Sequence, residues 1–206
     1  MKQRTGVRQA AVAAPALAVV LAVVLAGALT LPARAADPVA VPQQAAACGA
    51  CHGANGNSPT ADVPSLAGQP KQFITTQLVM FREGRRLNPV MAALTANMSN
   101  ADINALGGHY AAMPAMATAA PQSDDHQKAG RARAEALNCV QCHGAALKGQ
   151  QHIPRLAGQQ AAYLRTQLQG FKAQTRFDMD GNMTSAAQAM TAQDIELLAT
   201  YLAALP

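Results

Sequence analysis

The stretch ALNCVQCHGAALKGQ at residues 136–150 contains two cysteines three residues apart, with a histidine directly after the second. A similar stretch, AAACGACHGANGNSP, occupies residues 45–59. These two Cys-x-x-Cys-His motifs lie 91 residues apart and hold all four cysteines of the chain. A disulfide scaffold would spread its cysteines to close useful loops, so two tight pairs that each end in histidine indicate another chemistry.

The chain repeats itself around these motifs. PSLAGQ at residues 64–69 returns as PRLAGQ at residues 154–159, an offset of 90. Other matching positions keep an offset of 90 to 92, as short insertions in loops would produce. We therefore predict two copies of one small domain, at residues 36–117 and 128–206. A linker at residues 118–127, which contains Pro121 and polar residues, would join them.

Each copy is predicted to be helical. Residues 43–50 and 128–140 would form helices leading into the cysteine motifs, and residues 70–82 and 160–173 place apolar side chains on one helical face. A final helix in each copy carries one repeated apolar stripe: Ile103, Leu106, Tyr110 and Met113, then Ile195, Leu198, Leu202 and Leu205. Since no segment has a strand pattern, the predicted fold class is all-α.

The start of the final helix has a recognisable capping pattern. Ser99 and Thr191 suit the N-cap position, and an aspartate follows each of them three residues later, near a capping box. Met98 and Met190 precede these caps and would pack against an isoleucine in the first turn, as a hydrophobic staple. The pattern therefore gives Met98 and Met190 a packing role.

Residues 1–35 have the layout of a secretory signal peptide. Lys2, Arg4 and Arg8 form a basic start, a mostly apolar run continues to Leu31, and residues 33–35 read Ala-Arg-Ala, a small-x-small cleavage site. We predict that export removes this segment. The alternative is an uncleaved membrane anchor, because residues 12–31 approach the roughly 20 residues that a spanning helix needs.

The charge of the remaining chain does not indicate a nucleic-acid partner. Four of the 16 lysines and arginines lie in residues 1–35, and none of the 11 acidic residues does. The rest of the chain has 12 basic and 11 acidic residues, a net charge of +1. No strongly basic face remains for a phosphate backbone.

Three chemistries compete for the Cys-x-x-Cys-His motif. A thioredoxin-like disulfide exchange site would need a βαβ context, and the sequence predicts no strands. A zinc site would need four ligands in a tetrahedron, which would have to form between the two copies. The third is covalent attachment of haem c.

Haem attachment explains every element of the spacing. Two cysteines on one helical turn can each form a thioether to the edge of the macrocycle, and the histidine that follows can ligate the iron. The chain has only seven Phe and Tyr residues and no Trp. A large apolar macrocycle in each copy would supply the core that these residues do not.

A six-coordinate iron needs a ligand on its other face. Met91 and Met183 lie 39 and 40 residues after their histidines, in segments predicted to be loops before the final helix. A neutral methionine sulfur stabilises ferrous iron and raises the reduction potential. Met98 and Met190 already have a packing role, and Met80 has no methionine counterpart in the second copy.

Residues 39–206 resemble the cytochrome c4 family, in the motifs CGACHGANG and CVQCHGAAL, in PSLAGQ and PRLAGQ, and in the methionine segments and final helices. The resemblance implies two tandem class I cytochrome c domains, each wrapped around one covalently bound haem c. It implies that the haems are attached by Cys48, Cys51, Cys139 and Cys142. The proximal iron ligands would be His52 and His143, and the distal ligands would be Met91 and Met183. It also implies that the carbonyls of Pro64 and Pro154 accept hydrogen bonds from the two histidines.

The function implied by the resemblance is electron transport without enzymatic activity. The chain would carry electrons in the periplasm, from a membrane quinol-oxidising complex to a terminal oxidase, either free or peripherally associated with the membrane. Its partners would be redox proteins. One alternative is a dedicated haem acceptor subunit of a periplasmic dehydrogenase, and a diheme peroxidase would require one of the two methionines to be absent or displaced. A zinc-binding structural module is the remaining alternative.

Overall fold

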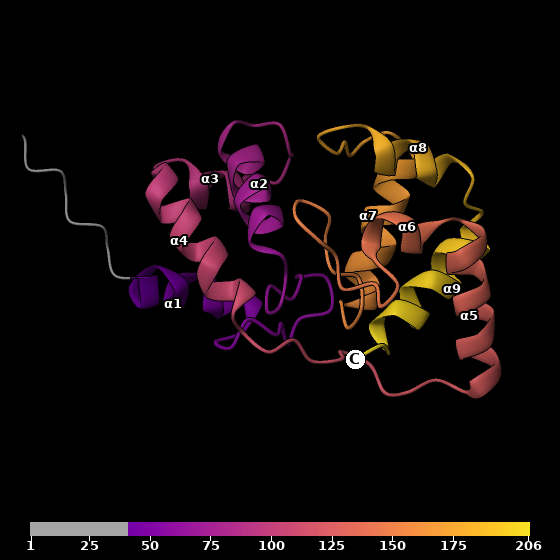
Figure 1. Ribbon diagram of the computed structural model, residues 1–206. Coiled ribbons are helices and arrows are strands. Elements are labelled where there is room, and N and C mark those ends of the chain that lie inside the picture. Colours follow the sequence, from indigo (N-terminus) through magenta and orange to yellow (C-terminus); the bar gives the residue numbers. More distant parts are fainter. Residues whose placement is uncertain (1–40) are drawn as a thin grey trace, which may run out of the picture. The chain divides into compact units, whose positions relative to one another are not determined.

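The computed structural model describes residues 41–206, and the predicted signal peptide at residues 1–35 lies outside them. The described residues form one compact unit. Figure 1 shows the helices of this part of the chain, which are α1 (Val41–His52), α2 (Lys71–Arg82), α3 (Pro89–Thr95), α4 (Asn100–Ala111), α5 (Asp124–Ala136), α6 (Cys139–His143), α7 (Ala161–Lys172), α8 (Asn182–Gln188) and α9 (Ala192–Ala203). No strand forms in residues 41–206, where Gln150 and Ile153 make only an isolated bridge, and the all-α prediction is confirmed.

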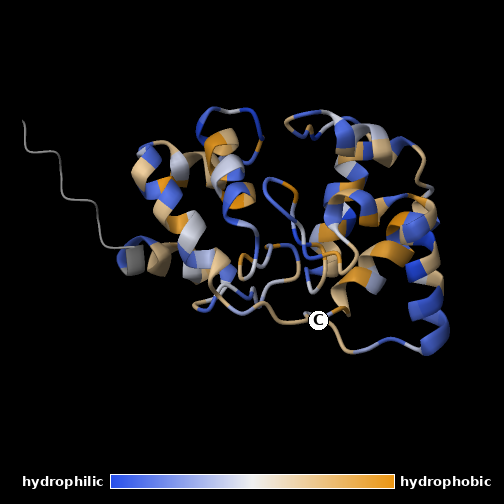
Figure 2. Ribbon diagram, in the orientation of Figure 1, coloured by the Kyte–Doolittle hydropathy of each residue, from blue (hydrophilic) through white to orange (hydrophobic). Residues whose placement is uncertain are grey.

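The helices pack within each copy of the repeat. In the first copy, α4 packs against α1 and α2, and α3 packs against α2. In the second copy, α9 packs against α5 and α7, and α8 packs against α7. The final helix is therefore the central element of both copies, as its repeated apolar stripe predicts. Figure 2 shows hydrophobic and hydrophilic residues interleaved along α9.

Each copy has its own apolar cluster. In the first copy Ile74, Leu106 and Tyr110 are buried together, and in the second copy Leu164, Leu198 and Leu202 occupy the matching region. The second cluster contains ten buried residues and the first contains four, so the apolar interior supplied by side chains is thinner in the first copy.

The predicted caps of the final helices are present. Ser99 accepts a hydrogen bond from the backbone amide of Asp102, and the Asp102 carboxylate accepts one from the amide of Ser99. Thr191 and Asp194 make the same reciprocal pair at the start of α9. Met190 is buried in the same cluster as Ile195, in agreement with its predicted packing role.

The helix predicted over residues 128–140 differs from the observed one. Helix α5 begins at Asp124, inside the predicted linker, because Ser123 caps it by accepting from the amide of His126 and two aspartates occupy its first turn. It ends at Ala136, and Asn138 adopts a left-handed conformation with φ 58° before α6 begins at Cys139. The sequence pattern did not predict this break.

The methionine segments, predicted to be loops, begin short helices instead. In α3 the Asn88 side chain accepts a hydrogen bond from the amide of Met91, and Pro89 occupies the first helical position, where its missing amide costs nothing. In α8 the helix starts after Gly181, whose φ is 74°. Seven-residue helices are too short to show a helical period clearly, so the periodicity did not reveal them.

Within residues 41–206, no helix combines the length and the apolar character needed to cross a membrane.

Candidate functional site

The two Cys-x-x-Cys-His motifs occupy equivalent positions on helical backbone. Cys48, Cys51 and His52 end α1, whereas the second motif makes up the whole of α6. Residues three apart on a helix are neighbours on its surface, so both thiols of each motif lie on one side of their helix. All four cysteines are free, with the first of each pair half-buried and the second exposed. Each motif therefore offers one side with two thiols available for covalent attachment.

Both histidines are buried and held by a proline carbonyl. The Nδ1 atom of His52 lies 2.7 Å from the carbonyl oxygen of Pro64, and the Nδ1 atom of His143 lies 2.8 Å from that of Pro154. A carbonyl oxygen only accepts, so Nδ1 carries the proton in both rings and the Nε2 lone pair is free. The two hydrogen bonds implied by the resemblance are present.

Burial keeps these imidazoles neutral. It lowers the pKa of His52 and of His143, although the proline carbonyl acts in the opposite direction by favouring the protonated ring. A neutral imidazole with a fixed tautomer, whose Nδ1–H is hydrogen-bonded to a carbonyl, is the form that ligates a metal through Nε2.

Burial also shapes the thiol chemistry. It raises the pKa of Cys48 and of Cys139, so both thiols are held in their neutral form. Cysteines that exchange disulfides have lowered pKa values in electropositive surroundings. The half-buried cysteines of this chain have the opposite environment, which disfavours a thioredoxin-like site.

The two candidate methionines lie at the starts of matching short helices. Met91 is the third residue of α3 and Met183 is the second residue of α8, and both are half-buried. The amide of Met91 donates to the side chain of Asn88 at 2.9 Å. The amide of Met183 donates to the Asp178 carboxylate at 2.8 Å. A polar side chain thus fixes the backbone of each methionine.

The Asp178 carboxylate makes further hydrogen bonds. It also accepts from the backbone amide and from the hydroxyl of Thr184, at 3.1 and 2.7 Å. Burial alone would raise the pKa of Asp178, but the hydrogen bonds from Thr184 and Met183 outweigh it and lower the pKa to about 2. Sequence reasoning missed both Asn88 and Asp178, because they occupy different places relative to their methionines.

The apolar clusters bring together only some of the candidate residues. Cys139 and Met183 pack against the cluster of the second copy. Cys48 and Met98 pack against the cluster of the first copy, while Met91 lies half-buried on α3. Nowhere in residues 41–206 do three or more His, Cys, Asp or Glu side chains gather as a metal-binding group.

Two half-buried arginines, Arg86 and Arg176, form a second repeated feature that sequence reasoning missed. Arg86 lies over the ring of Phe81 at 4.6 Å from its centre, and Arg176 lies over Phe171 at 4.4 Å. Each guanidinium donates to a glutamine of its own copy, Gln77 or Gln167. The offset of 90 between the arginines, within FREGRR and FKAQTR, is the signal that could have found them.

The arginines are placed around one hydroxyl group. Arg86 donates to the Tyr163 hydroxyl at 2.9 Å. Burial would raise the pKa of that hydroxyl, but the positive charges of Arg86 and Arg176 lower it. Burial lowers the pKa of Arg176 to about 10, and its Nε atom is a buried donor with no partner among the described residues. Neither arginine forms an ion pair with a carboxylate in residues 41–206.

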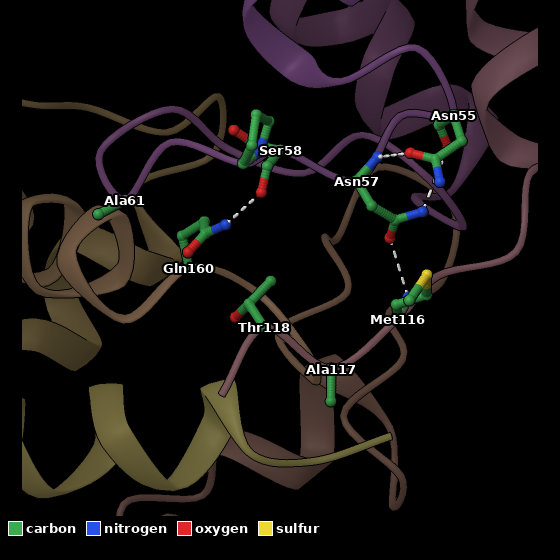
Figure 3. A pocket seen from close by; sticks show the side chains of 9 residues that line it. Asn55, Asn57, Ser58, Ala61, Met116, Ala117, Thr118 and Gln160 are labelled. Atoms are coloured by element: carbon green, nitrogen blue, oxygen red, sulfur yellow. Dashed lines mark hydrogen bonds between the residues drawn. The ribbon is translucent and has the colours of Figure 1, made fainter. Parts of the chain in front are cut away.

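A polar hollow of about 410 Å³ is lined by residues other than Arg86, Arg176 and Tyr163. Figure 3 shows its lining, which includes Asn57, Ser58, Thr118 and Gln160. Gln160 donates to the carbonyl of Ser58 at 2.6 Å, and the amide of Met116 donates to Asn57 at 2.9 Å. None of the predicted cysteine, histidine or methionine ligands lines this hollow.

Comparison with known proteins gives consistent relatives. The family model described as Cytochrome c matches residues 127–206. A thiosulfate dehydrogenase electron acceptor from Thiomonas intermedia is 38% identical over 198 residues, covering 91% of each chain. Cytochrome c4 from Pseudomonas aeruginosa is 33% identical, covering 83% of this chain and 90% of the relative. The crystal structure of reduced recombinant cytochrome c4 from Pseudomonas stutzeri superposes with a TM-score of 0.73 at 28% identity, covering 82% of this chain and 99% of that one.

Proposed function

Because this chain is a member of the cytochrome c4 family, we propose that it binds two haem c groups and carries electrons one at a time between redox proteins. Each copy of the repeat would bind one haem. Cys48 and Cys51 would attach the first haem, and Cys139 and Cys142 the second. The observation that carries this proposal is the pair of buried, neutral imidazoles whose Nδ1 atoms are occupied by proline carbonyls.

The resemblance to the cytochrome c4 family supplies the proposed iron ligands. His52 and His143 would ligate iron through the free Nε2 atom, and Met91 and Met183 would complete the two sites. The Pro64 and Pro154 carbonyls fix the orientation of the rings and increase their basicity as ligands. Asn88 and Asp178 fix the backbone of the methionines.

The charges of the chain also fit a haem. Each haem carries two propionate carboxylates, and Arg86 and Arg176 are half-buried and make no ion pair in the described part of the chain. The Nε donor of Arg176 has no partner within residues 41–206, and an anionic acceptor would satisfy it. These two arginines would hold the propionates.

The haem supplies reversible one-electron chemistry at iron when it is bound. The histidine and the methionine proposed in each copy would together hold the iron, which would leave no position for a substrate. Electron transfer would then be outer-sphere, without formation or cleavage of a bond to a ligand. This is why we propose a carrier and not an enzyme.

The proposed location is the periplasm, with residues 1–35 as the export signal. The proposed route leads from a membrane quinol-oxidising complex to a terminal oxidase. The partners would be redox proteins, with the chain free or peripherally bound to the membrane. These proposals rest on the resemblance to cytochrome c4 relatives.

A second function is supported by a specific relative. The 38% identical protein from Thiomonas intermedia is named a thiosulfate dehydrogenase electron acceptor. A dedicated acceptor subunit of a periplasmic dehydrogenase would use the same ligands as a free carrier. The distinction depends on the protein that delivers the electrons.

Reduction by defined donors tests these proposals. The ferric protein is mixed either with quinol and membranes that contain a quinol-oxidising complex, or with thiosulfate and a thiosulfate dehydrogenase, and its visible absorbance is followed. A free carrier is reduced through the membranes and reoxidised by a terminal oxidase. A dedicated acceptor is reduced only by the dehydrogenase and co-purifies with it. Failure of both donors to reduce the protein would contradict both functions.

A variant with Cys139→Ala and Cys142→Ala serves as the control for cofactor number. It should retain covalent haem in the first copy only, and the absorbance per chain should fall to about half. An unchanged absorbance would contradict attachment at the second motif.

A further inference from the structure

The repeated motifs PSLAGQ and PRLAGQ end in glutamines that are only 4% exposed, Gln69 and Gln159. The Gln69 side chain contacts the backbone of Arg155, in the other copy. Its Nε2 atom donates to the Arg155 carbonyl at 2.9 Å, and its Oε1 atom accepts from the Arg155 amide at 3.0 Å. One amide side chain therefore satisfies both backbone groups of a buried residue.

Gln159 makes the reciprocal contact. Its Nε2 atom donates to the Ser65 carbonyl at 2.9 Å, and its Oε1 atom accepts from the Ser65 amide at 2.8 Å. Ser65 and Arg155 are equivalent positions at an offset of 90, as are the two glutamines. Because only backbone groups are recognised, the side chain at this position can be serine in one copy and arginine in the other.

The position of these contacts connects them to the histidines. The Ser65 amide and the Pro64 carbonyl belong to one planar peptide group, and that carbonyl accepts the hydrogen bond from His52. Gln159 therefore binds the N–H of this peptide group, while the C=O of the same group accepts the hydrogen bond from His52. In the same way, Gln69 holds the peptide group between Pro154 and Arg155, which orients His143.

Hydrogen bonds in such a chain strengthen one another. An acceptor on the amide of a peptide group polarises its carbonyl, which then becomes a better acceptor. A better acceptor for Nδ1–H makes the imidazole more basic as a ligand, which favours ferric iron. The glutamine of one copy thus acts on the ligand of the other copy through one peptide group.

We propose that Gln69 and Gln159 are positioning residues that each orient, and tune, the proximal histidine of the opposite copy. The orienting role stands on the hydrogen bonds of the two glutamines, and the effect on iron rests on the proposed function. The two copies thus form one redox unit, in which neither proximal ligand has its full set of contacts without the other copy.

The test uses the intact haem protein with Gln159→Leu and, separately, Gln69→Leu. Gln159→Leu should speed hydrogen exchange of His52 Nδ1–H, measured by NMR in the reduced protein, by at least about tenfold, with little effect on His143. It should also raise the potential of the first haem by a shift of up to about tenfold in the one-electron equilibrium, or about 59 mV. Gln69→Leu should produce the reverse pattern.

Gln160→Leu is the matched control. Gln160 is the neighbour of Gln159 in the chain, and the substitution removes its 2.6 Å hydrogen bond to the carbonyl of Ser58. The Gln160 side chain does not bond to the Pro64–Ser65 or the Pro154–Arg155 peptide group. Both potentials and both Nδ1–H exchange rates should stay unchanged in this variant. If a leucine variant does not fold, Gln159→Glu keeps an acceptor for the Ser65 amide and should leave His52 Nδ1–H protected.

Two results would overturn the proposal. The first is equal change at both histidines, or change only in the copy that carries the substitution. The second is loss of His52 protection in Gln159→Glu. Failure of the proposed function would look different, because the unmodified protein itself would then lack iron-bound histidine signals.

Discussion

The two copies of the repeat reach the same histidine geometry by different local structures. In the first copy, α1 continues without a break through its Cys-x-x-Cys-His motif. In the second copy, the left-handed Asn138 separates α5 from α6. Nevertheless, the His Nδ1 to Pro O distances are 2.7 and 2.8 Å. The repeated side chains and the proline carbonyl define the site, whereas the continuity of the preceding helix does not.

The contact between the final helix and the opening helix is charged in the second copy, whereas its donor is neutral in the first copy. In the second copy Arg133 donates two hydrogen bonds to the Asp194 carboxylate, at 2.6 and 2.7 Å. In the first copy the matching Asp102 accepts from the neutral side chain of Gln44, at 2.6 Å. An ion pair in one copy thus has a neutral hydrogen bond as its counterpart in the other. The same helix-to-helix contact can be made with either chemistry.

The largest expected effect comes from exchanging a proposed axial ligand. Met183→His should lower one of the two reduction potentials by about 200 mV, because a neutral soft sulfur is replaced by a more basic nitrogen, and axial ligands spread haem potentials over about 0.8 V. Met91→His should lower the other potential instead. Redox titration of both variants checks this.

Met190→Leu is the control for this exchange, since Met190 is buried in the apolar cluster. It should leave both potentials nearly unchanged. A large drop in Met190→Leu, or two unmoved potentials in Met183→His, would contradict the ligand assignment.

An intermediate effect is expected at a close helix contact of the second copy. A Cβ atom on Gly130 would lie 2.3 Å from Cγ of Tyr201, between α5 and α9. Gly130→Ala should therefore reduce the free energy of unfolding by about 1–3 kcal/mol, the usual cost of overpacking. Denaturant unfolding of the haem protein measures this change.

Gly108→Ala in α4 of the first copy is the matched variant, since a Cβ there meets nothing within 4 Å. It should increase the free energy of unfolding by up to about 1 kcal/mol, because alanine loses less backbone entropy than glycine in a helix. Equal destabilisation by both variants would show that close contact is not the cause.

The smallest expected effect is on the loss of thermal stability at acid pH. The Arg133 guanidinium holds the pKa of Asp194 well below its ordinary value, and the hydrogen bonds from Ser99 and Gln44 lower the pKa of Asp102. A lowered pKa in the folded chain gives stability above about pH 4 that is lost as the pH falls further. Asp194→Asn should therefore flatten the loss of thermal stability between pH 5 and 3 by a few degrees, and Asp102→Asn by less.

Thermal melts of the two variants across this pH range measure the difference. The ordering would be wrong if Asp102→Asn had the larger effect, or if both melts kept the steepness of the unmodified chain.

The sequence predicted the elements that depend on repeated side chains. The apolar stripes gave the final helices, and Ser99 and Thr191 marked their starts, because a capping box is a local pattern. The two Pro carbonyl contacts followed from the family resemblance. By contrast, the break at Asn138 depends on one backbone conformation, and α3 and α8 are too short to show a helical period.

The contacts between copies were also beyond sequence reasoning. Gln69 and Gln159 appear as the last residues of the repeated motif, but their partners are backbone groups about 90 residues away. No side-chain pattern marks a backbone partner. Arg86 and Arg176 were likewise visible only as repeated positions, without an indication that both are partly enclosed beside Tyr163.

The most direct test of the central claim is a visible and near-infrared absorption spectrum of the exported protein, with iron counted per chain. We predict two iron atoms and two covalently attached low-spin haems, with the charge-transfer band of a methionine bound to ferric iron. A colourless protein, or one that takes up carbon monoxide at either iron while it remains folded, would contradict two haems closed by histidine and methionine.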